Sequence, residues 1–192
     1  MALIFIARQI VKVSTKRTPV VTLRYEDNYS LTYAETIEAY KALAKEHLTA
    51  KLLNYGSTDI GLPLHLFVIS KTKNFSPDAI KEKGFRVIMV SNGIHPGEPC
   101  GVDASVKLAR DILGKKDGLW EKMDSTILCI IPIYNVGGAL NRSPYSRANQ
   151  NGPQEQGFRA NAKNLDLNRD FAPMKSKNAQ TFARIFHQWK PD

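Results

Sequence analysis

Two residues that could act together chemically, His95 and Glu98, lie three positions apart in the stretch His95-Pro-Gly-Glu98. The Pro-Gly pair between them breaks regular structure and predicts a turn. An imidazole nitrogen and a carboxylate oxygen are both zinc ligands, so this spacing can present two ligands to one ion. A purely structural interpretation also exists, in which His95 closes the turn and Glu98 stabilises the positive N-terminus of a helix.

The flanking sequence places this turn between a strand and a helix. Residues 87–90 form an apolar run of strand length, and an apolar face with helical spacing runs through residues 99–113. Open α/β sheets bind their ligands at the carboxyl ends of their strands. His95 and Glu98 are therefore expected where such a fold would carry out its chemistry.

A second group of chemical interest comes about seventy residues later, with Arg159, Asn168 and Arg169. Arginine offers a planar fork that matches a carboxylate, and asparagine adds a neutral donor. Neighbouring side chains on a regular strand point to opposite faces, so Asn168 and Arg169 can serve one site only where the backbone is irregular. Each of these residues could instead be a loop residue facing solvent.

Together the two stretches resemble the zinc metallocarboxypeptidases of the carboxypeptidase A/B type. The His-x-x-Glu motif of that family appears as His95-Pro-Gly-Glu98, and its Arg-x-Asn-x-x-Gly-Val-Asp-Leu-Asn-Arg-Asn-Phe segment corresponds to residues 159–171. The turn at residues 56–64 is also familiar from bacterial members. The resemblance covers residues 29–192 and is strongly specific because both motifs occur in this order.

The resemblance implies a zinc-dependent carboxypeptidase that removes C-terminal residues from peptides. His95 and Glu98 would be ligands of a Zn²⁺ cofactor, and Arg159 would polarise the scissile carbonyl. Asn168 and Arg169 would grip the free C-terminal carboxylate of a peptide or small amide substrate. Family members suggest a secreted or periplasmic protein, although no signal peptide is evident in this sequence.

Three departures from the family pattern bear on function. Asn135-Val-Gly-Gly138 replaces an Asn-Pro-Asp-Gly turn, and Asn164 replaces a glycine, although asparagine tolerates a positive φ. The third zinc ligand, a substrate-capping tyrosine and a general-base glutamate are expected beyond Asp192. None of the three remaining histidines is placed to substitute for the missing ligand: His47, His65 and His187.

The 192-residue chain alone is therefore expected to be inactive, as the N-terminal portion of a catalytic domain. Two alternatives to a carboxypeptidase remain open at this point. One is a zinc-dependent deacylase or amidase of the same fold. The other is a non-catalytic module that retains a residual carboxylate-binding site.

The predicted fold is α/β, a doubly wound mixed sheet with helices on both faces, truncated before its last strands. Residues 1–28 are expected to be an N-terminal extension, and residues 29–192 the N-terminal portion of the catalytic domain. Parallel strands separated by a helix end at the same edge of a sheet, so the five site residues are expected to converge there. The pattern predicts helices at 32–48, 99–113 and 174–189, a hairpin at 51–70, strands at 85–90 and 126–134, and loops at 71–84 and 135–163. Thr32 and Glu35 are expected to form a capping box at the start of the first helix. Leu48 on the first helix and Phe186 on the last are expected to be buried.

Composition narrows the classes of partner. The net charge is +9, but the 27 Lys and Arg residues are scattered and no aromatic stripe alternates with them, so nucleic-acid binding is not predicted. No apolar run approaches membrane-spanning length, and no membrane partner is expected. Of the two cysteines, Cys129 lies in an apolar run and is expected to be buried, whereas Cys100 follows the His-x-x-Glu turn.

Overall fold

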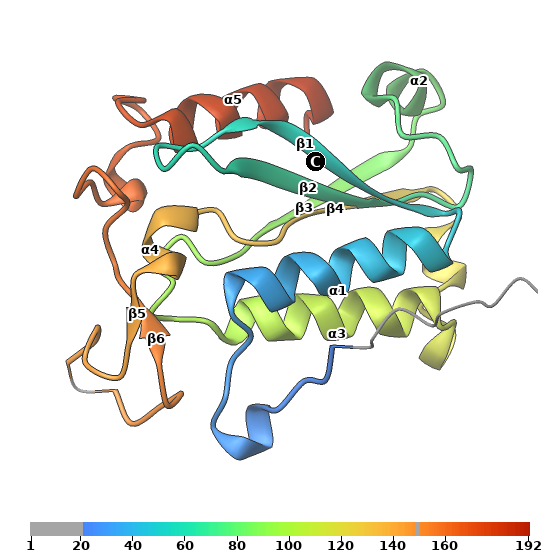
Figure 1. The fold of residues 1–192 in the computed structure, drawn as a ribbon. Helices are drawn as coiled ribbons and strands as arrows, with labels where there is room; N and C mark the ends of the chain where they lie inside the picture. The colour runs from blue at the N-terminus through green and yellow to red at the C-terminus, as the bar shows by residue number, and fades with distance from the viewer. Residues whose placement is uncertain (1–20, 149) are drawn as a thin grey trace, which may run out of the picture.

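A computed structural model describes residues 21–148 and 150–192 and shows an α/β fold built on a four-stranded mixed sheet (Figure 1). Its strands are β1 (Ala50–Ser57), β2 (Pro63–Ile69), β4 (Thr126–Ile131) and β3 (Arg86–Ser91), in that spatial order. The β1–β2 and β2–β4 pairs are antiparallel, and β3 and β4 are parallel. The predicted fold class is confirmed.

Helices cover both faces of the sheet. On one side lie α1 (Tyr33–Glu46) and α3 (Cys100–Leu113), and on the other lie α5 (Lys177–Trp189) and the short α2 (Pro77–Glu82) (Figure 1). Alternation along β2 supplies both cores, because successive side chains of a strand face opposite sides. Phe67 and Ile69 join the core under α1 and α3, whereas Leu66 and Val68 join the core under α5.

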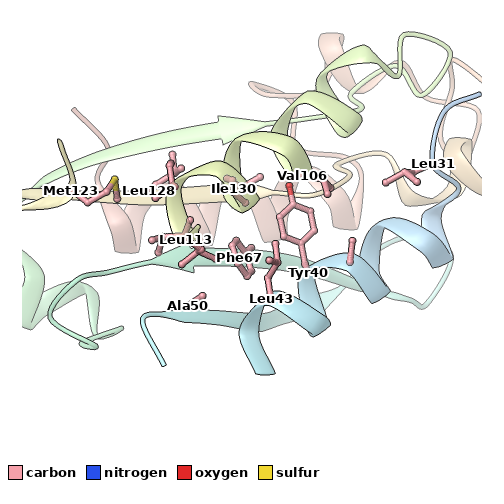
Figure 2. Close-up of a cluster of buried hydrophobic side chains, with 14 residues drawn as sticks. Leu31, Tyr40, Leu43, Ala50, Phe67, Val106, Leu113, Met123, Leu128 and Ile130 are labelled. Atoms are coloured by element: carbon pink, nitrogen blue, oxygen red, sulfur yellow. The ribbon is translucent and has the colours of Figure 1, made fainter. Parts of the chain in front are cut away.

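The core under α1 and α3 is closed by aromatic packing. Tyr40 and Phe67 are fully buried, and their ring centroids lie 4.7 Å apart (Figure 2). The capping box predicted for α1 is confirmed. The Thr32 hydroxyl accepts from Glu35 N at 3.2 Å, and the Glu35 carboxylate accepts from Thr32 N at 2.8 Å.

Some details of the predicted burial are wrong. Leu48 is 77% exposed because α1 ends at Glu46, which leaves Leu48 beyond the helical stripe. Phe186 is also exposed, because it lies outside the α5 face that Ile185 and Trp189 bury. The predicted loop 71–84 contains α2, which begins with Pro77 at its first helical position, as proline's fixed φ favours.

The strand that leads into the site, β3, is an edge strand rather than a fully buried one. Val87 is buried, but Ile88 is 52% exposed, because in the described sheet β3 pairs with β4 alone. The backbone around Asp192 runs beside β3, where Asp192 N donates to Val87 O at 3.0 Å. The predicted parallel pairing of residues 85–90 with 126–134 is confirmed, with Val87 opposite Ile127.

None of the helices in the described part of the chain has the length and apolar character needed to cross a membrane. Of the predicted extension at residues 1–28, residues 1–20 lie outside the described residues.

The remaining elements are short. They are η1 (Tyr25–Asp27), η2 (Lys116–Gly118), η3 (Glu121–Met123), α4 (Val136–Leu140), β5 (Arg142–Ser143), β6 (Gln156–Gly157) and η4 (Leu167–Arg169).

Candidate active site

The turn after β3 is fixed to the segment that follows β4. Tyr134 N donates to Asn92 O at 2.7 Å, and Asn135 N donates to Gly93 O at 3.1 Å. Gly93 has φ +61°, a left-handed conformation that glycine adopts without a steric penalty. Because the two strand ends are joined in this way, the turn carrying His95 sits in a defined position against the core.

His95 is 6% exposed and has a different partner at each ring nitrogen. Its Nε2 lies 3.0 Å from Asp166 Oδ1, and its Nδ1 lies 3.6 Å from Glu98 Oε1. An ionised carboxylate accepts hydrogen bonds and does not donate them, so Asp166 assigns the proton to Nε2. Nδ1 is then left with its lone pair directed toward the Glu98 side.

Asp166 is the central carboxylate of this site. Besides His95, it accepts from Arg159 Nε at 3.1 Å and Nη2 at 2.9 Å, and from Asn168 N at 3.0 Å. The hydrogen bond from His95, followed by those from Arg159 and Asn168, lowers the pKa of Asp166 to about 2, although partial burial opposes the shift. Asp166 therefore stays ionised at neutral pH and joins the two sequence motifs.

No role of Asp166 was predicted from the sequence, although this residue lies within the motif at residues 159–171. A signal was available, because a metal-binding histidine commonly donates its second ring N–H to a carboxylate. Which carboxylate does so depends on a contact across 71 positions. Spacing along the chain does not reveal such a contact.

Arg159 brings a positive charge to the Nδ1 side of His95. Its Nη1 lies 3.4 Å from His95 Nδ1, while its Nε and Nη2 are held by Asp166. The Asn135 side chain donates to Arg159 O at 3.0 Å and so fixes the backbone as well. The guanidinium is therefore oriented before any ligand arrives, with one nitrogen directed toward the imidazole.

Asn168 and Arg169 lie in η4, outside any regular strand. Such a segment is what adjacent side chains need if they are to serve one site. Asn168 joins the cluster through its backbone N–H, which bonds to Asp166. The Arg169 side chain is exposed and donates to Asn168 O at 3.0 Å. The structure thus brings together His95, Glu98, Arg159 and the backbone of Asn168, whereas the Arg169 guanidinium makes no described contact with the other site side chains.

The turn before η4 survives the replacement of glycine by asparagine. Asn164 has φ +58°, as its tolerance of the left-handed region allowed. Asn161 closes the turn, because its Oδ1 accepts from both Lys163 N and Leu165 N at 2.9 Å. This local network sets the direction from which Asp166 approaches His95.

A further arginine, Arg147, reaches the site from the long loop and was not predicted. Its Nη2 donates to Glu98 Oε1 at 2.8 Å across 49 positions. Nearby, Gln150 Nε2 donates to Gly97 O at 2.6 Å. Both contacts hold the His-x-x-Glu turn against the loop. Neither contact could be predicted from residue type or spacing in the sequence.

The donor chemistry of His95 and Glu98 fits a zinc ion. Ligands of a tetrahedral zinc site lie about 3.4 Å apart, given metal–ligand distances near 2.1 Å. The 3.6 Å between Nδ1 and Oε1 matches this spacing. Across residues 21–148 and 150–192, no group of three or more His, Cys, Asp or Glu side chains could hold a metal ion. The described residues thus provide a pair of donors.

Most of the chain matches a known protein family. The sequence profile of the zinc carboxypeptidase family matches residues 36–189. No curated protein matches. Among solved structures, a putative carboxypeptidase from Burkholderia mallei is 19% identical with a TM-score of 0.63, over 85% of this chain and 38% of that one.

Two further solved structures share the fold. A metallo-carboxypeptidase from Burkholderia cenocepacia is 16% identical with a TM-score of 0.66, over 85% of this chain and 39% of that one. Carboxypeptidase A from Helicoverpa armigera is 18% identical with a TM-score of 0.63, over 83% and 42%. The chain spans about two fifths of the length of these structures.

Proposed function

Because the chain belongs to the zinc carboxypeptidase family, we propose that the whole protein removes C-terminal residues from peptides by zinc-dependent hydrolysis. The observation that carries the proposal is the arrangement around His95. Asp166 accepts a hydrogen bond from Nε2–H at 3.0 Å, which leaves Nδ1 facing Glu98 Oε1 at 3.6 Å. A histidine oriented in this way, beside a carboxylate at ligand spacing, is suited to bind a metal ion.

Different residues of this chain would bind the zinc ion and the peptide substrate. His95 Nδ1 and Glu98 would hold the zinc ion, which when bound supplies a water of lowered pKa and polarises a carbonyl group. Arg159 would donate from Nη1 to the oxygen that gains negative charge during hydrolysis. Asn168 and Arg169 would bind the C-terminal carboxylate and so restrict cleavage to the end of a peptide.

The role of Arg169 predicts a dependence on the substrate's terminal charge. In the whole protein, Arg169→Ala is expected to raise KM for peptides with a free C-terminal carboxylate about tenfold or more, and to change KM for the corresponding amides little. The loss of a charge-assisted pair costs about 1.5–3 kcal/mol. Steady-state kinetics on matched acid and amide substrates measure the difference.

A control for this experiment is Arg86→Ala, which removes the same charge at the opposite end of β3. It is expected to leave both KM values unchanged. Equal effects of Arg169→Ala on acids and amides would contradict the assignment of Arg169 to the carboxylate. The guanidinium can reach a substrate because it is exposed and held by a single hydrogen bond to Asn168 O.

We further propose that the 192-residue chain alone binds zinc weakly and hydrolyses nothing. Catalytic zinc sites use three protein ligands, whereas the described residues bring two donors together at His95 and Glu98. Equilibrium dialysis against zinc, followed by metal analysis, should find substoichiometric zinc. Stoichiometric zinc with measurable peptide hydrolysis would show that this chain supplies a ligand not counted among the two.

A further inference from the structure

The ion pair between Arg147 and Glu98 is the feature of the site that the proposed reaction leaves unused. Arg147 Nη2 donates to Glu98 Oε1 at 2.8 Å, and this is the only hydrogen bond to that carboxylate within residues 21–148 and 150–192. The Glu98 side chain is 51% exposed. Without Arg147, the carboxylate would therefore be free to change rotamer and to leave the Nδ1 side of His95.

Arg147 depends on this contact in turn. Its side chain is only 24% exposed, and Nη1 is buried without a hydrogen-bond partner in the described part of the chain. Among those same residues, Glu98 is the one carboxylate that balances this largely buried positive charge. A charge removed from water needs a close partner of opposite sign, so the guanidinium is held on Glu98 and is not shared among several contacts.

Glycine at position 97 makes room for the Arg147 side chain. A Cβ atom added to Gly97 would lie 2.6 Å from Arg147 Cδ and closer still to Cγ, which is a steric clash. The aliphatic part of the arginine therefore passes directly over the backbone between His95 and Glu98. A larger residue at position 97 would push the guanidinium away from Glu98, so the Pro-Gly pair of this turn also permits the ion pair.

The loop that carries Arg147 is fixed to the same turn on both sides of the arginine. The β5–β6 pair closes the base of the loop, where Gly157 N donates to Pro96 O at 3.2 Å (Figure 1). Beyond Arg147, Gln150 Nε2 donates to Gly97 O at 2.6 Å. The guanidinium thus reaches the carboxylate from an anchored segment, as a group that orients a ligand must.

The contact is compatible with a metal ion on the same carboxylate. An ionised carboxylate has about four lone-pair sites, so Glu98 can accept from Arg147 and still offer a lone pair to an ion. The 3.6 Å between Glu98 Oε1 and His95 Nδ1, which matches a zinc site, occurs with Arg147 in place. Hydrogen bonds to ligating carboxylates are a regular part of metal sites and tune their affinity.

We infer that Arg147 is a positioning residue, which holds the Glu98 carboxylate at ligand spacing from His95 and so raises the affinity of the site for zinc. This role rests on the proposed function for the assignment of His95 and Glu98 to a metal ion. It predicts an effect opposite in sign to that of charge alone. A positive charge repels a nearby cation, so the loss of Arg147 would strengthen zinc binding if repulsion dominated.

In the whole protein, Arg147→Ala is expected to lower the affinity for zinc about tenfold or more, the usual cost of losing a partner of a metal ligand. Competition with a chromophoric chelator measures this affinity without any peptide hydrolysis, and circular dichroism verifies that the variant is folded. Arg147→Lys keeps the charge but loses the planar fork, so it should recover only part of the lost affinity, and it carries the test if the alanine variant does not fold. Unchanged or higher zinc affinity in the folded variant would overturn the positioning role.

A matched control is Gln150→Ala, which removes another contact between the same loop and the same turn. Gln150 bonds to the backbone at Gly97 and Gly152, and none of its described hydrogen bonds is to the Glu98 carboxylate. The zinc affinity of this variant should stay within a factor of two of that of the unmodified protein. A loss equal to that in Arg147→Ala would mean that docking of the loop, and not orientation of the carboxylate, determines the affinity, and it would overturn the assignment.

A double-mutant cycle tests whether Arg147 acts through Glu98. In a Glu98→Ala background the carboxylate is absent, so Arg147→Ala should no longer weaken zinc binding; an undiminished loss there would overturn the role. Arg147-dependent zinc binding by a whole protein that hydrolyses no peptide would retain the positioning role and reject the proposed function. Peptide hydrolysis with zinc binding that does not depend on Arg147 would do the reverse, and a whole protein that binds no zinc would reject both.

Discussion

Arg159→Ala in the whole protein is expected to lower kcat about a hundred- to a thousandfold, the usual cost of removing one donor to a developing oxyanion. Asp166 holds two nitrogens of this guanidinium at 2.9–3.1 Å, and Nη1 is left 3.4 Å from His95 Nδ1. A donor fixed in this way stabilises charge that appears only as the reaction proceeds. kcat and kcat/KM should therefore fall together, with KM nearly unchanged.

Two further variants make this result specific. Arg159→Lys keeps the positive charge but loses the fork that Asp166 grips, so it should recover only part of the lost activity. Arg86→Ala removes an arginine at the far end of β3 and should leave kcat within twofold of the unmodified enzyme. A folded Arg159→Ala enzyme with kcat within threefold of the unmodified enzyme would remove Arg159 from the catalytic step.

Asp166→Asn is expected to lower the zinc affinity of the whole protein about 10–100-fold, because Asp166 fixes the ring orientation and tautomer of His95. In the present chain the same substitution should lower the free energy of unfolding by about 1.5–3 kcal/mol, through weaker hydrogen bonds to a charged group. Competition with a chromophoric chelator gives the first quantity. Urea denaturation gives the second.

The control is Asp124→Asn, which removes an aspartate that also forms an ion pair, with Lys71 at 2.5 Å. Its side chain is 77% exposed, and exposed ion pairs contribute only about 0–1 kcal/mol. A loss of stability in Asp166→Asn no larger than in Asp124→Asn would mean that Asp166 does not organise the site. Unchanged zinc affinity would reject its role in orienting His95.

Local signals account for the parts of the fold that the sequence predicted. The capping box of Thr32 and Glu35 marks the start of α1, and the apolar run at residues 126–134 marks β4. The exposure of Leu48, Phe186 and Ile88 was not predictable in the same way. It depends on where a helix ends, on which face packs against the sheet, and on which strand lies at the edge.

The same distinction between local and long-range information applies to the candidate site. His95 and Glu98 are three residues apart, so their chemistry is visible in the sequence. Asp166 and Arg147 reach them across 71 and 49 positions, and the direction in which each side chain points is set by tertiary packing. Spacing identifies two side chains that share a turn, whereas the carboxylate that bonds to His95 can be identified only in the folded chain.

The burial of Leu167 determines how rarely this site comes apart. Leu167 is fully buried under α5 and lies between Asp166, which holds His95 and Arg159, and Asn168. Local opening of this segment would expose the leucine to water at a cost of about 1.5–3 kcal/mol, which lowers the population of the open state roughly ten- to a hundredfold. The burial of this aliphatic side chain thus adds to the part-buried hydrogen bonds of Asp166 in keeping the site assembled.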